Sequence, residues 1–377
     1  MNSNRIRNNS MLGWMAFTLV TAIALAAAPV ARADPQGRYQ QHNLVTDGFV
    51  PADKTDSLHL KNPWGIVFNP FGPVWISDNG SGFSTIYDGA GNLLLAVTIP
   101  AAAGAAHGNP TGIVFNGNAN AFPVPVPTAP SGSGPAKFIF ATEDGVIAGW
   151  NSGPSAMLVT DNSPSHAVYK GLALSAGGNG ALLYAADFHN NRIDVWNSSF
   201  ASVSLGAGAF TDPTLPAGFA PFGIQAINGN VYVTYAKQDA DKHDDVQGKG
   251  LGYVNVFDPN GKLIDRVISK GPLNAPWGLA LAPADFGDFS NSLLVGNFGD
   301  GRINAFDLAT GEFLGTLKGA DGKPISIEGL WGLAFGNGYS GQPVNTLFFT
   351  AGSNGEAGGL YGRIDPIPGK AHGHGHD

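Results

Sequence analysis

The chain contains no cysteine among its 377 residues. That absence excludes disulfide bonds, thiolate metal sites and thiol catalysis. Only 13% of the residues are charged, and no long helical period of apolar residues appears after the first thirty positions. The sequence also lacks a phosphate-binding Walker loop and a nucleophile elbow. What it has instead is 54 glycines, 26 prolines and 43% hydrophobic residues, the composition of a turn-rich β protein with a sizeable core.

The charge balance is acidic, with 20 basic and 28 acidic side chains. Residues 1–33 contain three arginines and no acids, so the remainder has 17 basic residues against 28 acidic ones, a net charge of −11. A chain this acidic offers no basic stripe for a phosphate backbone. We therefore expect no nucleic-acid partner.

One phrase recurs six times: a glycine, usually after an aromatic residue, followed by a short apolar run. Asn62–Phe68 is the first copy and Gly329–Phe335 is the last. The repeat glycines are Gly65, Gly112, Gly171, Gly223, Gly278 and Gly332, which stand 47 to 59 residues apart. Short strands repeating at this interval are typical of propeller blades. Because space is short where blades converge, the strand after each glycine is predicted to be the innermost one of its blade.

Each copy of the glycine phrase is followed by two further strands that form a hairpin, as at residues 182–196 and 293–307. A tight turn rich in Asp, Asn and Gly joins the two strands of the hairpin, and another turn leads to an outer strand. Four strands per repeat and six repeats predict an all-β fold, a six-bladed β-propeller with four-stranded antiparallel blades. The last blade lacks an outer strand after residue 364. We expect residues 42–46, His42 to Thr46, to supply it, so that pairing of the N- and C-terminal strands closes the ring.

The ends of the chain look different from the repeats. Arg5 and Arg7 precede an apolar run over residues 11–30, and Ala31-Arg32-Ala33 is a small-x-small cleavage signal. We therefore expect a signal peptide over residues 1–33, a propeller over 34–365 and a disordered His/Gly tail over 366–377. This organisation predicts an exported protein, periplasmic or extracellular, with no transmembrane segment after cleavage; an uncleaved anchor is the alternative.

The segment Tyr-Ala-Ala-Asp-Phe-His-Asn-Asn-Arg-Ile-Asp-Val-Trp at residues 184–196 resembles an NHL-type propeller repeat. Distinctive stretches at residues 62–65, 138–145, 220–224 and 294–301 extend the match. Through them the chain resembles an uncharacterised family of exported bacterial six-bladed propellers with NHL-like blades. The resemblance implies the fold but no activity, because propellers host binding modules and enzymes alike.

The residue before each repeat glycine is expected to ring one mouth of the central channel. These residues are Trp64, Thr111, Lys170, Phe222, Trp277 and Trp331. One interpretation is an aromatic cup with a single cation, able to stack a sugar or another flat ligand. The other is that the bulky rings only plug the channel.

Three groups of residues offer metal ligands. His107, His166 and His189 fall near the same face and would suit Zn²⁺. The acidic loop with Asp239, Asp241, Asp244 and Asp245 offers oxygen ligands that would suit Ca²⁺, although we favour the interpretation that it is a long solvated loop. The tail residues His372, His374 and His376 alternate with glycine and would chelate a transition metal. No cofactor follows with certainty; a divalent metal, Ca or Zn, is the candidate.

We therefore expect an exported propeller scaffold that binds a small molecule, a glycan or a protein partner at the channel-mouth face. Two alternatives stay open. One is a metal-dependent lyase or lactonase at the same face, since some six-bladed relatives are such enzymes. The other is a structural envelope or matrix protein. The sequence names neither the ligand nor a reaction.

Overall fold

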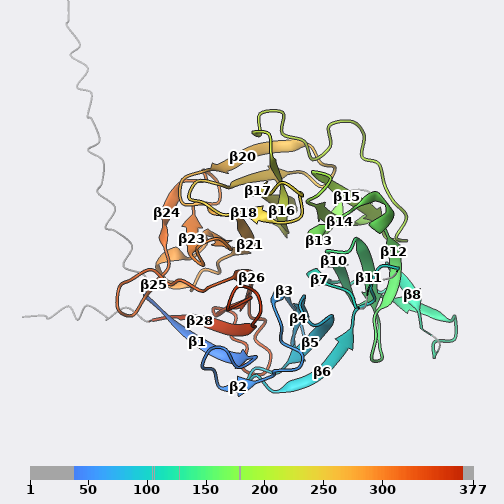
Figure 1. Ribbon diagram of the computed structural model, residues 1–377, viewed down its shortest axis with the longest axis horizontal. Coiled ribbons are helices and arrows are strands. Elements are labelled where there is room, and N and C mark those ends of the chain that lie inside the picture. The colour runs from blue at the N-terminus through green and yellow to red at the C-terminus, as the bar shows by residue number, and fades with distance from the viewer. Residues whose placement is uncertain (1–37, 104, 106, 127, 178–179, 368–377) are drawn as a thin grey trace, which may run out of the picture. The chain divides into compact units, whose positions relative to one another are not determined.

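The computed structural model describes residues 38–103, 105, 107–126, 128–177 and 180–367. These residues form six antiparallel sheets set around a central axis, and Figure 1 looks down that axis. Blade one is β3 (Pro63–Phe68), β4 (Val74–Asp78), β5 (Phe83–Tyr87) and β6 (Leu93–Thr98). Blade two is β7 (Pro110–Phe115), β10 (Phe138–Thr142), β11 (Val146–Trp150) and β12 (Met157–Asp161). Blade three is β13 (Tyr169–Gly177), β14 (Gly180–Asp187) and β15 (Arg192–Asn197).

Blade four is β16 (Phe219–Ile227), β17 (Asn230–Gln238), β19 (Tyr253–Phe257) and β20 (Leu263–Ser269), with β18 (Asp245–Val246) paired to β17. Blade five is β21 (Pro276–Leu281), β22 (Leu293–Asn297), β23 (Ile303–Phe306) and β24 (Phe313–Thr316). Blade six is β26 (Leu330–Phe335), β27 (Leu347–Ala351), β28 (Leu360–Pro366) and β1 (Arg38–Thr46). Short strands β2 (Lys54–Thr55) and β25 (Lys318–Gly319) pair with β1. The predicted six-bladed propeller is confirmed.

Ring closure is confirmed as well, because β1 is the outer strand of blade six. It pairs antiparallel with β28 from Tyr39 opposite Pro366 to Thr46 opposite Leu360. The strand starts four residues before the predicted His42. The ring of Tyr39 is buried, and its hydroxyl donates to the Phe286 carbonyl of blade five at 2.9 Å. The strand therefore contacts a neighbouring blade as well as completing its own.

The six repeat glycines all lie on the innermost strands, as predicted. Each faces the backbone of the next inner strand around the ring. A Cβ on Gly278 would lie 2.5 Å from the Trp331 carbonyl oxygen, and one on Gly332 would lie 2.5 Å from the Trp64 carbonyl oxygen. Any side chain here would push two blades apart. The glycines are therefore required by close approach of adjacent strands.

Apolar side chains fill every interface between blades. Trp75 and Phe138 stack with ring centroids 3.8 Å apart between blades one and two, for example. Comparable clusters lie in the other five interfaces, and a further one lies on the axis. Each sheet is therefore buried on both faces, and the ring as a whole forms one core.

Two segments depart from regular blades. The proline-rich stretch between β7 and β10 forms a small hairpin, β8 (Pro123–Pro125) and β9 (Ser133–Pro135), which Figure 1 shows at the rim. Phe122 and Val124 in this stretch are buried between blades two and three. Blade three has three regular strands, and its outer position is held by a single bridge between Trp196 and Ser202.

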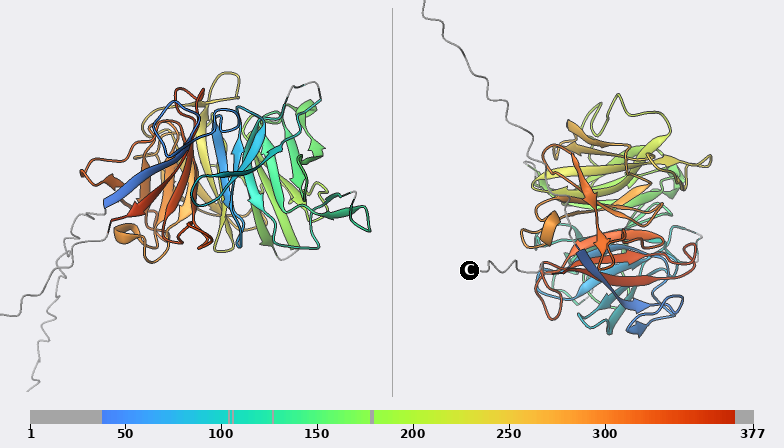
Figure 2. Two further views of the ribbon diagram at one scale, coloured as in Figure 1. Left: turned by 90° about the horizontal axis from the view of Figure 1, so that it is seen from below. Right: turned by 90° about the vertical axis from the view of Figure 1, so that its left-hand side faces the viewer.

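The remaining regular elements are the 3₁₀ turns η1 (Ser163–Ser165) and η2 (Gly287–Phe289). No helix within the described ranges has the length and apolar character needed to cross a bilayer. The predicted signal peptide over 1–33 and the histidines of the tail lie outside the described residues. Figure 2 shows the side views of the ring, with strands running between two faces.

Candidate functional site

The six inner strands all begin at one face of the ring, which we call the channel-mouth face. The aromatic residues that precede the glycines meet there on the axis. The Trp64 and Trp331 rings stack with centroids 3.5 Å apart, and Trp277 meets both edge-on at 6.0 and 5.7 Å. Phe222 and Phe298 pack on Trp331. None of these rings is more than 8% exposed. They therefore fill the end of the channel as a plug.

The plug is fixed by hydrogen bonds as well as by stacking. The Trp331 Nε1 donates to Asn62 Oδ1 at 3.1 Å, and the Trp277 Nε1 donates to the Lys170 carbonyl at 3.0 Å. The indole N–H of Trp64 has no protein partner in the described part of the chain. The structure thus brings the predicted aromatic residues together, with their faces closed against one another. Ligand binding by these rings stays a prediction.

The two polar members of the predicted ring differ from each other. Thr111 is buried, and its hydroxyl bonds to the carbonyls of Ala141 and Tyr169 at 3.2 and 2.7 Å, which explains it as a link between strands. Lys170 is also buried, but its ammonium lies 5.1 Å from the centre of the Trp64 ring, in a cation–π contact. Lys170 therefore places a positive charge directly on the aromatic plug.

Carboxylates from two loops surround that charge. The Nζ of Lys170 donates to Glu143 Oε1 and to Asp244 Oδ1, the latter at 3.3 Å. Burial alone would lower the pKa of Lys170, but the nearby charges of Glu143 and Asp244 outweigh it, and the pKa is raised. The amine stays protonated at neutral pH. It is therefore unsuited to act as a nucleophile or a base.

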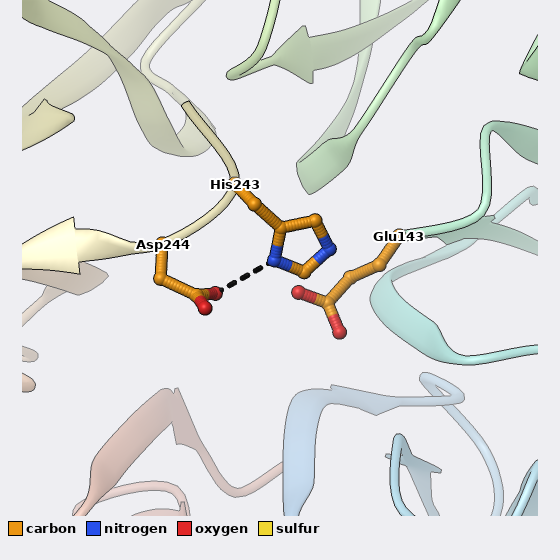
Figure 3. A group of neighbouring side chains, drawn as sticks. All are labelled: Glu143, His243 and Asp244. Atoms are coloured by element: carbon orange, nitrogen blue, oxygen red, sulfur yellow. Dashed lines mark hydrogen bonds and ion pairs between the residues drawn. The ribbon is translucent and has the colours of Figure 1, made fainter. Parts of the chain in front are cut away.

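His243 completes a group of potential metal ligands with Glu143 and Asp244. One ligand atom from each lies within 4.8 Å of the other two, and no other such group of three occurs in the described ranges. Figure 3 shows the His243 Nδ1 bonded to Asp244 Oδ1, a distance of 2.9 Å. That bond raises the pKa of His243 and, despite partial burial, holds the pKa of Asp244 down at about 2.

Two further carboxyl groups, those of Asp245 and Glu356, lie next to this charged group, and burial makes both of them harder to ionise. Burial raises the pKa of Asp245 to about 7; Lys170 opposes the shift and Glu356 adds to it. The Oδ2 of Asp245 is buried without a hydrogen-bond partner in the described structure. Burial also raises the pKa of Glu356, which accepts a bond from the Asn62 amide at 2.8 Å. Perturbed acids next to a cavity are a feature of functional sites.

A cavity of about 490 Å³ opens beside this group, between blades five and six. Glu356 forms the wall that the cavity shares with the charged group. Asp300 and Glu328 supply two more carboxylates, and Phe298 lies at the base, where its ring stacks on Trp331 with centroids 4.0 Å apart. We call this cavity the acidic pocket. Its described lining includes no lysine or arginine.

The opposite end of the channel has another character. A cavity of about 530 Å³ is lined there by the last residues of the inner strands, such as Phe68, Phe115 and Phe335. Gln225 and Asn228 are its polar side chains, and no charged residue appears in the described lining. Of the two cavities at the ends of the channel, the one at the channel-mouth face is therefore the one whose described lining carries ionisable side chains.

The other predicted metal ligands are placed as follows. His166 and His189 approach each other, with ring centroids 6.0 Å apart, whereas the ring of His107 bonds to the Gly108 carbonyl. The three histidines do not form a ligand group within the described residues. In the acidic loop, Asp244 joins Glu143 and His243, while Asp239 accepts a bond from the His243 backbone. Asp241 is exposed.

Glu143, His243 and Glu356 were not among the sequence-based candidates. All three follow the second strand of their blade, in the loops after β10, β17 and β27. Loops in that position reach the channel-mouth face in any propeller of this topology. This rule already places His189 on that face, so applying it to every blade would have identified these three residues.

Comparisons with known proteins agree with the architecture. No protein-family model matches the chain. "Uncharacterized protein R648" of Acanthamoeba polyphaga mimivirus is 34% identical over 332 residues, which cover 85% of this chain and 78% of that protein. "Uncharacterized protein L690" of the same virus is 32% identical over 314 residues, covering 81% and 80%.

Among solved structures, a structural genomics protein of unknown function from Bacteroides thetaiotaomicron superposes with a TM-score of 0.55 at 10% identity, covering 87% of this chain and 76% of its own. A glucose dehydrogenase gives 0.51 at 12% identity, covering 88% and 99%. A streptogramin B lyase gives 0.50 at 12%, covering 89% and 100%. Identities this low show the fold alone.

The sheets and their arrangement make this protein a six-bladed β-propeller. Within that class, the chain belongs to the same family as the mimivirus proteins R648 and L690. The resemblance seen in the sequence is thus supported in its fold. These relatives are viral, and a bacterial, exported family stays a prediction.

Proposed function

We propose that this protein is a binding propeller whose acidic pocket receives a small organic cation. The observation that carries the proposal is the pocket itself, about 490 Å³ with Asp300, Glu328 and Glu356 in its walls and Phe298 at its base. Cavities of roughly 300–1,000 Å³ are the usual size for small-molecule sites. A bare ion would leave most of this volume empty.

Electrostatics favours a cationic ligand. The nearest buried cation, Lys170, is already bonded to Glu143 and Asp244 and does not line the pocket. Lys170 therefore does not neutralise Asp300, Glu328 or Glu356. The described residues that line the cavity include no side chain of opposite charge to these three carboxyl groups. An ammonium group in the cavity would gain the field of these carboxylates.

Titration calorimetry with matched pairs of ligands tests this proposal. Choline is compared with its neutral isostere 3,3-dimethylbutanol, and glucosamine with glucose. We expect saturable binding of at least one cation and none of its neutral partner. Glu328→Gln should weaken that binding about tenfold, the scale of one lost charged contact. Asp288→Asn, an exposed acid in η2 outside the pocket lining, is the control. Equal binding of neutral isosteres would disprove the proposal.

A metal-dependent enzyme is the second candidate, and the group Glu143, His243 and Asp244 favours it. One imidazole and two carboxylates suit Zn²⁺ and leave a coordination position open. The ammonium of Lys170 bonds to two of the three ligands, so a metal at this place must compete with it. Three protein ligands are fewer than Ca²⁺ normally takes.

Metal analysis of the purified protein separates the two candidates. The chain is truncated after Gly369, because the tail histidines would bind metal by themselves. A stoichiometric metal that is lost in His243→Ala supports the metal site. His42→Ala, an exposed histidine paired with Asp53 on blade six, is the control. Metal-free protein that still binds choline would favour the binding propeller.

Export is part of the proposal and rests on the residue pattern of positions 1–33. The test is expression of the full chain in a bacterial host, followed by fractionation and mass spectrometry of the N-terminus. We expect a product outside the cytoplasm that begins at Asp34. A full-length cytoplasmic product would contradict export without affecting the pocket.

A further inference from the structure

A third hollow lies far from the channel axis, between the outer parts of blades two and three. It has a volume of about 290 Å³ and lies between β12 and β15. Blades one, two, four, five and six each have a regular outer strand. In blade three the chain turns after β15, and in the described structure the short stretch from Ala201 to Val203 pairs with it. The missing length of strand leaves this groove open.

The groove has a set of polar groups held in fixed positions. The Asn162 amide donates to the Tyr169 hydroxyl at 2.7 Å, and that hydroxyl donates to Asp194 Oδ2 at 2.8 Å. Arg192 Nε donates to the other oxygen of Asp194 at 2.7 Å. Burial, with the charge of Asp194, raises the pKa of Tyr169, so its hydroxyl stays a donor. These bonds hold the amide of Asn162, the guanidinium of Arg192 and the carboxylate of Asp194 in fixed positions at one wall of the groove.

The charges in the groove nearly cancel. Arg192 pairs with Asp194 and, at 3.3 Å, with Asp187 behind it. The remaining polar side chains are the hydroxyls of Thr160, Ser165 and Ser202. A wall of this kind has no strong preference for an anion or a cation. It suits an uncharged ligand with many hydroxyl groups, which can both donate and accept hydrogen bonds.

Aromatic surface completes the groove. Phe200 is partly exposed at one side, and it is held there by contact with the buried Phe122, with ring centroids 5.0 Å apart. Trp196 contributes to the floor. An aromatic face beside planar hydrogen-bonding groups matches a sugar ring, which has apolar C–H faces and a polar rim.

An extended peptide is a poorer fit to the same groove. A peptide strand would have to pair with the free edge of β15. Backbone bonds from Ala201 and Val203 already occupy that edge at Asn197 and Val195. Only the first residues of β15 remain available, which is too short a stretch for a stable added strand.

We propose that the groove lined by Asn162, Arg192, Asp194 and Phe200 is a binding site for a neutral sugar residue, separate from the channel-mouth face. The ring lies against Phe200, and its hydroxyls bond to the Arg192, Asp194 and Asn162 side chains. This site does not depend on the acidic pocket, so either can fail without the other.

Saturation-transfer NMR on the full chain tests the site, with methyl glucoside, methyl mannoside, methyl galactoside and N-acetylglucosamine as probes. We expect saturation transfer to at least one probe. In a separate heteronuclear spectrum of the protein, adding that probe should shift the amide signals of Thr160, Asp194 and Ser202. Phe200→Ala and Arg192→Ala should each weaken binding about tenfold. Arg302→Ala, an exposed arginine at the same hairpin position of blade five, should leave it unchanged.

Three results would overturn the inference. One is that no probe binds in a saturable way. Another is that binding persists unchanged in Phe200→Ala and Arg192→Ala while both variants keep the native melting temperature. The third is that the shifted amides lie at the channel-mouth face. If a variant unfolds, Ser202→Trp, which fills the exposed side of the groove, replaces it and should abolish binding.

Discussion

The two ends of the central channel are made by the same six strands, yet they differ in almost every property. At the channel-mouth face, Trp64, Trp277 and Trp331 close the axis, and ionisable groups gather over them. At the far end, a cavity of about 530 Å³ lies open between side chains that carry no charge. Strand geometry alone therefore does not determine where the chemistry of this propeller lies.

The difference comes from what flanks each strand. At the start of each inner strand a glycine allows two blades to approach closely, and the aromatic residues that precede four of these glycines meet on the axis. At the other end the strands separate and space remains. The loops on the channel-mouth side also carry Glu143, Asp244 and Glu356, which place charge where the apolar space is already filled. The aromatic plug and the charged side chains therefore lie at the same end of the channel.

The largest effect is expected from removing a ring of the plug. Trp331 is 1% exposed and stacks on both Trp64 and Phe298. Trp331→Ala should lower the free energy of unfolding by about 3–5 kcal/mol, measured by urea denaturation. At the far end, Phe115 is only half-buried, and Phe115→Ala should cost about 1–2 kcal/mol. Equal losses would show that the two ends are packed alike.

Removing the buried cation is expected to have the next largest effect. Lys170→Met keeps the apolar stem but leaves the mostly buried Glu143 without its opposite charge, whereas Asp244 is largely exposed and keeps its bond to His243. Breaking one side of a buried pair costs about 3 kcal/mol. Lys262→Met, an exposed lysine, should change stability by less than about 0.5 kcal/mol. A Lys170→Met variant as stable as the native protein would mean that the charged group is dispensable for folding.

The repeat glycines provide a smaller test of the same comparison. Gly278→Ala places a methyl group 2.5 Å from the Trp331 carbonyl, and overpacking of this kind costs about 2 kcal/mol. Gly117 follows the inner strand of blade two at the far end, and the nearest atom to an added Cβ there is 3.4 Å away. Gly117→Ala should be nearly neutral in thermal denaturation. A neutral Gly278→Ala would contradict the close approach of the inner strands.

A last test of the comparison is a pH dependence that arises at the channel-mouth face. The pKa of Asp245 is raised to about 7, so the folded state keeps a proton that the unfolded chain releases near pH 4. Stability contributed by this group should fall as the pH rises from about 4 to about 7. Affinity for an organic cation should rise over pH 6–8, as the carboxylate forms. Asp245→Asn should flatten both dependences in calorimetry; unchanged slopes would assign them to other groups.

Most of the fold was predictable from the sequence because it rests on a repeated local rule. The glycine phrase identified every inner strand, and the incomplete last repeat indicated that residues near His42 close the ring. The outer position of blade three was not predicted. Ser198 to Gly218 has no alternating pattern that distinguishes a short bridge from a strand.

For the candidate site, the sequence predicted which residues gather at the channel-mouth face only in part, and their role in binding stays a prediction. The axial positions of Trp277 and Lys170 followed from their place before a glycine. The pairing of Lys170 with Glu143 and Asp244 joins residues 27 and 74 positions apart. No local pattern links such partners, because loop conformation brings them together. The acidic pocket likewise depends on how blades five and six meet.

The outer strand of blade six also sets the order in which the molecule can be completed. β1 is among the first segments of the propeller to be synthesised, and its partner β28 is among the last. The ring therefore cannot close until synthesis has passed Pro366. Until then, the edge of β1 that pairs with β28 in the folded protein has no partner. Pairing at such sequence separation is slow, since nearly the whole chain must be ordered first. We expect interrupted synthesis, more than heat or denaturant, to be the condition under which this protein aggregates.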